Sequence, residues 1–170
     1  MFRINLVNNE PNAIINNPSV LSNDSFYTNF WFSKNKTNVY FNNNIITDTS
    51  NFTTEDFDYG RFLFPNFYEI IVSLTELPNK NVAFLVNSNR NNFGRFSFLA
   101  MYNLSTKVFM QTLPLKNIEN TVNGKKQMFQ AEAKFVFSNK REDKIVAVTH
   151  GIDETDKLNS NWGIEIMRVD

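Results

Sequence analysis

The stretch "MFQAEAKFVF", residues 128–137, alternates between two kinds of side chain. The residues of one parity are all phenylalanine or alanine: Phe129, Ala131, Ala133, Phe135 and Phe137. The residues of the other parity are mostly polar: Met128, Gln130, Glu132, Lys134 and Val136. Only an extended strand places two such sets on opposite sides, because a helix would scatter the phenylalanines around its axis. We therefore expect a strand whose first set faces the core, with Phe135→Ala costing about 3–5 kcal/mol.

The same period of two recurs along the chain. In "FYEIIVSL" (67–74) it places Tyr68, Ile70, Val72 and Leu74 on one face, and in "GRFSFLAMY" (94–102) it does so for Phe96, Phe98, Ala100 and Tyr102. "NVAFLV" (81–86) is apolar on both faces, which predicts a central strand. Weaker strands are expected at 2–7, 26–32, 38–41, 61–64, 106–111, 144–149 and 162–169.

Short turn-forming segments separate these strands. "NG" at 123–124 is a strong hairpin signal, and "SNKRED" (138–143) joins two predicted strands. "TTEDF" (53–57) could form a single helical turn, and no segment shows a convincing helical repeat. Since parallel sheets need helices between their strands, the spacing predicts an all-β chain with almost no helix. We expect one domain over residues 1–170, an antiparallel β-sandwich or jelly-roll-like barrel of about eight to ten strands.

Composition narrows the function classes. The chain has no cysteine, which excludes disulfides and thiolate metal sites, and one histidine, which disfavours most zinc hydrolases. Seventeen basic residues balance seventeen acidic ones, so nucleic acid is disfavoured as a partner. We find no secretory signal and no run of the roughly 18 apolar residues that a membrane span needs. We therefore expect a protein made in the cytoplasm without a signal peptide.

The segment "VTHGIDETDKLNSNWG" (148–163) contains the single histidine, His150. The residues whose oxygens could contact calcium are Asp153, Glu154, Asp156, Asn159 and Asn161, but the calcium-loop pattern with its required glycine is absent. We expect residues 150–161 to connect the last two strands and to hold no catalytic group. If the loop binds a ligand, Trp162 would do so with Asp153, Asp156 or Asn161. Trp162 could stack on a sugar ring, although the pattern favours a core residue at the start of the last strand.

The run "FYTNFWF" (26–32) is the most aromatic in the chain. Tyr27 and Trp31 lie on one parity and phenylalanines on the other, so both faces of this strand are aromatic. Either the strand is buried on both sides or one side meets a partner. Tyr27 and Trp31 are therefore candidate interface residues.

No pattern points to catalysis, a cofactor or a metal. The sequence thus favours a non-catalytic structural or interaction protein that works with protein partners as a homo- or hetero-oligomer. A virion or tail component of a phage fits the small size, the absent cysteines and the 28 asparagines, which suggest an AT-rich genome. The alternative is a carbohydrate-binding, lectin-like β-sandwich module.

Overall fold

The structure is a computed structural model that describes residues 2–7, 10–16, 30–42, 44–48, 59–64, 69–89, 97–152 and 161–169. Within these ranges the regular structure is β-strand, apart from one 3₁₀ turn at Pro78–Lys80. The strands are β1 (Phe2–Val7), β2 (Glu10–Asn16), β3 (Phe30–Phe32), β4 (Asn38–Phe41), β5 (Ile45–Asp48), β6 (Tyr59–Arg61), β7 (Glu69–Leu77), β8 (Val82–Asn89), β9 (Phe98–Asn103), β10 (Phe109–Leu113), β11 (Ile118–Val122), β12 (Lys125–Phe129), β13 (Ala131–Ser138), β14 (Lys144–Gly151) and β15 (Trp162–Arg168). The all-β prediction is confirmed.

The strands form antiparallel sheets of neighbours in the chain. The sheets are β1–β2, β3–β4–β5–β6, β7–β8–β9–β10, β11–β12 and β13–β14–β15. Among the described residues there are more strands than the eight to ten expected, since the sequences of strands such as β2, β5 and β11 lack a clear alternation. Their up-and-down order supports the sandwich, and no described sheet has the crossed connections of a jelly roll.

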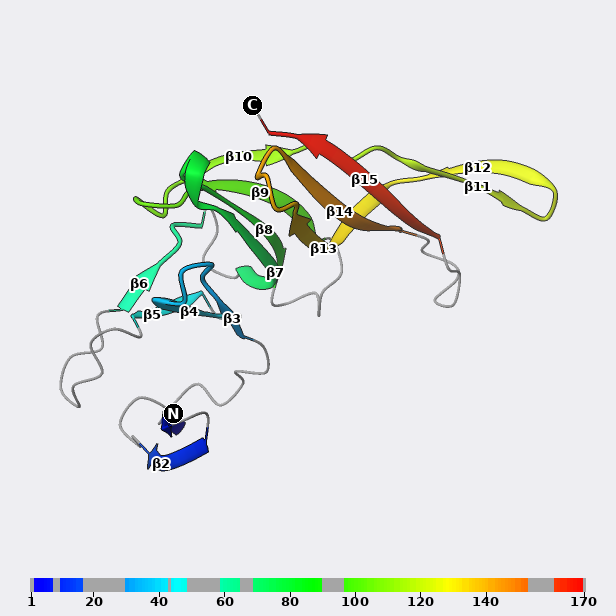
Figure 1. The fold of residues 1–170 in the computed structure, drawn as a ribbon. Coiled ribbons are helices and arrows are strands. Elements are labelled where there is room, and N and C mark those ends of the chain that lie inside the picture. The colour runs from blue at the N-terminus through cyan, green and yellow to red at the C-terminus, as the bar shows by residue number, and fades with distance from the viewer. Residues whose placement is uncertain are drawn as a thin grey trace.

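The β7–β10 sheet forms the middle of the molecule, with the β3–β6 sheet on one side and the β13–β15 sheet on the other (Figure 1). β8 lies inside this sheet, as predicted for residues 81–86. Ala83 and Leu85 pack with Tyr40 and Phe62 in one core, whereas Phe84 packs with Val136 in the other. Both faces of β8 are therefore covered, which explains why its sequence is apolar at every position.

The predicted face of residues 128–137 is right at its start and wrong at its end. The stretch divides into β12 and β13, and Phe129 and Ala133 are buried as expected. A β-bulge at Lys134 then reverses the alternation, because Ala133 pairs with Thr149 and Phe135 with the adjacent Val148. Val136 is consequently buried, whereas Phe135 and Phe137 are 47% and 54% exposed. The large cost predicted for Phe135→Ala is therefore wrong.

A second bulge alters the predicted face of residues 67–74. The register of β7 against β8 shifts between Ile71 and Ser73. Val72 therefore packs against the core shared with β13, whereas Leu74 packs against the core shared with β4. By contrast, β9 has no such irregularity against β8, and Phe98, Ala100 and Tyr102 share one face as predicted.

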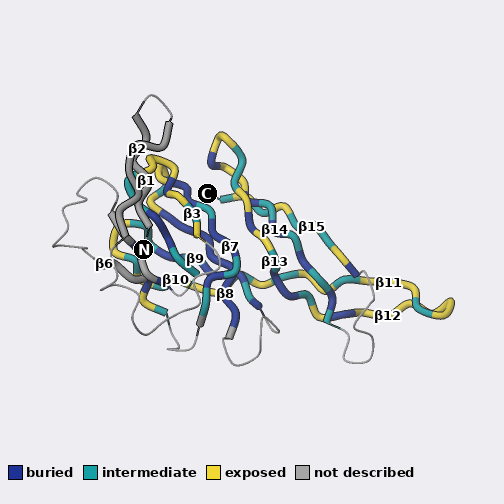
Figure 2. The backbone as a smooth tube through the Cα atoms, turned by 90° about the horizontal axis from the view of Figure 1, so that it is seen from below, coloured by how far each residue is buried: buried dark blue, intermediate teal, exposed yellow. Residues whose placement is uncertain are grey.

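The turn at Asn123–Gly124 has the conformation that its sequence predicts. Asn123 and Gly124 both have positive φ, 51° and 75°, and join β11 to β12 through the pair Val122–Lys125. This is the two-residue hairpin that the "NG" signal predicts. The β11–β12 hairpin extends from the body as an exposed arm (Figure 2). The helical turn predicted at 53–57 lies outside the described residues.

Candidate interaction surface

The β13–β15 sheet has a second apolar face, opposite the one that packs on the core. Residues that pair across the three strands form level rows on this face. One row is Phe137, Val146 and Ile166, and the next is Phe135, Val148 and Ile164. These six residues, together with Trp162 in the following row, are called the outer face below.

The outer face is open to solvent in the structure. Its large side chains are 47–73% exposed: Phe135, Phe137, Trp162, Ile164 and Ile166. With about 200 Å² for a large side chain, these five present on the order of 600 Å². That area is at the upper end of the largest apolar patch on a typical monomer, about 300–600 Å², and such patches mark interaction sites.

Polar rows border the outer face at both ends. Lys144 pairs with Arg168 at one end, and both are exposed. At the other end Glu132 pairs with His150, which pairs with Trp162. Glu132 is largely buried, and its carboxylate lies 2.5 Å from Lys134 Nζ and 3.6 Å from His150 Nδ1.

The structure brings together only part of the predicted loop site. β14 runs to Gly151 and β15 begins at Trp162, so a connection joins the last two strands as predicted, but His150 belongs to the strand. Trp162 is 53% exposed, so its interpretation as a core residue is wrong; its ring lies 4.9 Å from that of His150. Asn161 is buried and its side chain accepts a hydrogen bond from Asn120 on the arm, so it is not an exposed polar contact. The other candidates, Asp153, Glu154, Asp156 and Asn159, lie outside the described residues.

The aromatic run at 26–32 is divided between core and surface. Trp31 is half-buried and packs against the core that contains Tyr40, whereas Phe30 and Phe32 on the other parity are 58% and 60% exposed. Their rings meet edge to face at 5.7 Å. Trp31 is therefore a packing residue. The exposed side of β3 consists of Phe30 and Phe32, which the sequence did not indicate as interface residues. Tyr27 lies outside the described residues.

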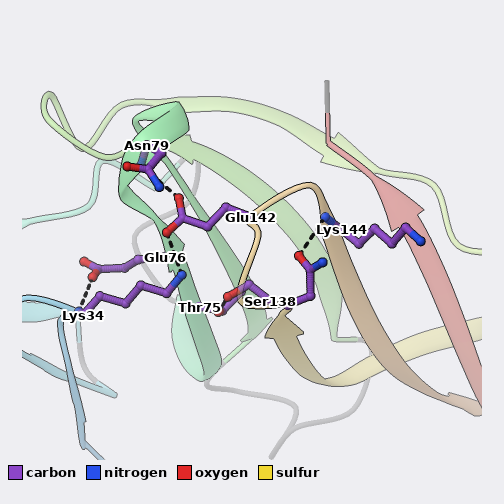
Figure 3. Close-up of polar contacts among 8 residues, drawn as sticks. Lys34, Thr75, Glu76, Asn79, Ser138, Glu142 and Lys144 are labelled. Carbon is purple, nitrogen blue, oxygen red and sulfur yellow. Dashed lines mark hydrogen bonds and ion pairs between the residues drawn. The ribbon is translucent and has the colours of Figure 1, made fainter.

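Buried charged groups connect the three layers (Figure 3). Glu142, in the turn between β13 and β14, accepts hydrogen bonds from Lys34 Nζ at 2.8 Å and from the Asn79 backbone at 2.9 Å. Glu76 of β7 accepts the Tyr40 hydroxyl and the Lys34 backbone N–H. The contacts join residues 36 to 108 positions apart in the sequence, which is why no local motif indicates them.

Two pKa shifts follow from this packing. Burial, together with the hydrogen bond to Glu76 and its charge, raises the pKa of Tyr40, so its hydroxyl stays protonated and donates. Burial lowers the pKa of Lys107, although the charge of Glu76 opposes this. The Lys107 ammonium lies 5.5 Å and 5.3 Å from the ring centroids of Tyr40 and Phe62. These groups stabilise the fold and do not converge on an open site.

We predict that Glu142→Gln destabilises the fold mainly at neutral pH. Burial alone would raise the pKa of Glu142, but Lys34 and the Asn79 N–H outweigh it and hold the pKa below the ordinary 4.5. Since the folded pKa is depressed, the stabilisation is complete above the unfolded pKa and is lost as the pH falls through the folded value. Urea unfolding of both proteins across the acid range should show the difference shrinking at low pH. A constant difference would contradict the assignment.

The structure also contains a cavity of about 420 Å³ at the junction of the layers. It is lined by Ser97, Phe98, Leu113, Leu115, Asn117, Gln130, Ala131, Glu132 and Ile152. In the described part of the chain, no group of three or more histidine, aspartate or glutamate side chains is placed to hold a metal ion. No helix in that part is long and apolar enough to span a membrane.

Comparisons with known proteins give no further guide to this surface. No protein-family model matches the chain, and no curated protein matches it.

Proposed function

We propose that the protein is a non-catalytic interaction protein that joins a larger assembly through the outer face. The observation that carries the proposal is the apolar grid of Phe135, Phe137, Ile164 and Ile166, exposed on a sheet whose other face is core. Exposing about 600 Å² of such side chains is costly in water, and a partner that covers them recovers that free energy. The exposed pair Phe30 and Phe32 offers a smaller second contact on another sheet.

The charged groups also support a structural role. The buried carboxylates of Glu76 and Glu142 each contact groups that they stabilise within the fold. Catalytic carboxylates instead need an open site that shifts their pKa toward the working pH. Within this proposal, a phage virion or tail is the assembly that the composition favours.

The test is the size of the protein in its native source. We expect wild-type chain in a fresh extract to migrate with a mass above that of one 19.8 kDa chain. Ile164→Lys, which places a charge in the centre of the outer face, should shift it toward the monomer. Met110→Lys is the matched control, because Met110 is 49% exposed on β10, in another sheet. If wild type and Ile164→Lys both migrate as monomers, the proposal is wrong.

The second candidate function is carbohydrate binding, and one observation favours it. Trp162 is 53% exposed at the end of the outer face, where its ring could stack on a sugar. In that case a glycan array should show binding by wild type, and Trp162→Ala should weaken it about tenfold or more. Binding that survives Trp162→Ala would contradict this role for the tryptophan.

A further inference from the structure

We infer that the occupant of the outer face is a second copy of this chain, packed sheet against sheet about a two-fold axis perpendicular to the strands. The inference rests on the proposed function and specifies its partner. Three features of the described residues support a second copy over another partner: the order of the rows, the area of the face and the composition of β14.

The rows are self-complementary under this symmetry. Along the strands they run from Lys144–Arg168, through the two apolar rows, to Glu132–His150–Trp162. A two-fold axis between the apolar rows places each of them against the other apolar row of the second copy. The basic row of one copy then lies over His150 and Trp162 of the other, with Arg168 over Trp162, twice per dimer. A cation–π contact between Arg168 and Trp162 favours that placement.

The area fits a dimer of this kind. A standard interface buries about 800 Å² on each partner, with an apolar centre and a polar rim. The outer face supplies about 600 Å² of large apolar side chains, and the half-buried Val146 and Val148 and the basic row extend it. Stacked sheets pack about 10 Å apart, which suits interdigitating phenylalanine and isoleucine side chains.

The composition of β14 indicates what kind of element covers it. β14 is apolar on both parities, as is β8, and both faces of β8 are covered by sheets. In β14 the inner set, Ile145 and Ala147, is covered by the β7–β10 sheet, while Val146 and Val148 face outward. A second β13–β15 sheet completes for β14 the environment that β8 already has.

The experiment measures the mass of the purified full-length chain by sedimentation equilibrium over a wide concentration range. We expect a monomer–dimer equilibrium for wild type. Ile164→Lys should raise the dimer dissociation constant about 100-fold or more, because it buries an unpaired charge at the centre of the interface. Met110→Lys should leave it unchanged. Arg168→Glu should weaken the dimer about tenfold, because it removes the cation–π contact with Trp162 in both halves of the dimer. Lys125→Glu on the exposed arm is its charge-matched control.

The outcomes separate the two proposals. If purified wild type stays monomeric at every concentration while the extract shows an assembly that Ile164→Lys disrupts, the second copy is wrong and the assembly function stands. If neither experiment shows association, both are wrong. If Ile164→Lys dissociates the dimer and Arg168→Glu has no effect, the proposed symmetry is wrong. Circular dichroism of each variant, matching that of wild type, excludes unfolding as the cause.

Discussion

Replacing Phe84 by alanine is expected to lower the free energy of unfolding by about 3–5 kcal/mol. Phe84 is 2% exposed on the central strand β8 and packs with Val86, Leu99 and Val136 between two sheets. The surrounding strands are covered on both sides and cannot collapse into the space left by the ring. The loss therefore includes both the lost burial and the cost of a cavity.

Phe135→Ala is the matched control for this measurement. Phe135 also lies on a strand that packs on the core, but it is 47% exposed and stacks on Phe137. We expect a cost of about 1 kcal/mol or less. Both variants are compared with wild type by equilibrium urea unfolding, at concentrations where the chain is monomeric. Equal costs would show that the bulge at Lys134 does not turn Phe135 outward.

Glu76→Ala is expected to cost about 2–4 kcal/mol, the second largest effect. Glu76 is 5% exposed and accepts hydrogen bonds from the Tyr40 hydroxyl and the Lys34 backbone N–H. Its charge also favours the ammonium form of the half-buried Lys107. Removing the carboxylate leaves two donors unsatisfied and takes away the charge that favours the Lys107 ammonium, which is costlier than losing one bond.

Tyr40→Phe tests how much of the stabilisation by Glu76 comes from its hydrogen bond with the Tyr40 hydroxyl. It removes one hydroxyl and keeps the ring, which packs 5.6 Å from that of Phe62. Because Glu76 still accepts the Lys34 N–H, we expect a smaller cost, about 1 kcal/mol. Thermal and urea unfolding of the two variants measure the difference. A Tyr40→Phe cost that equals that of Glu76→Ala would contradict the role given to the carboxylate.

Local patterns were reliable where the structure depends on neighbouring residues. The Asn123–Gly124 turn needs positive φ at two successive positions, and asparagine and glycine adopt positive φ more readily than other residues do. The alternation in 94–102 predicted the shared face of Phe98, Ala100 and Tyr102, because β9 pairs with β8 without interruption. β8 itself was predicted as central because a strand covered on both sides needs no polar parity.

The candidate site was harder to predict because it depends on which apolar residues remain uncovered. The sequence indicated Trp162 as a candidate ligand-binding residue, and in the structure Trp162 is exposed and belongs to the outer face. Ile164 and Ile166 were not predicted to lie on this face, although "WGIEIM" alternates. The reason is that the apolar side of a single strand normally faces the core. The second apolar parity of β14 was the signal in the sequence that could have indicated this exposed face.

The sequence by itself determined that this chain is built of antiparallel strands, since a period of two and the turn residues act within a few positions. Only the tertiary structure decided which way the side chains of β7 and β13 face. Ser73 of β7 accepts a hydrogen bond from the Val136 N–H at 3.1 Å, beside the two bulges and across 63 positions of sequence. One extra residue in a strand moves all later side chains to the opposite face. The choice is made by contacts between sheets, and therefore Val136 enters the core while Phe135 and Phe137 form the surface.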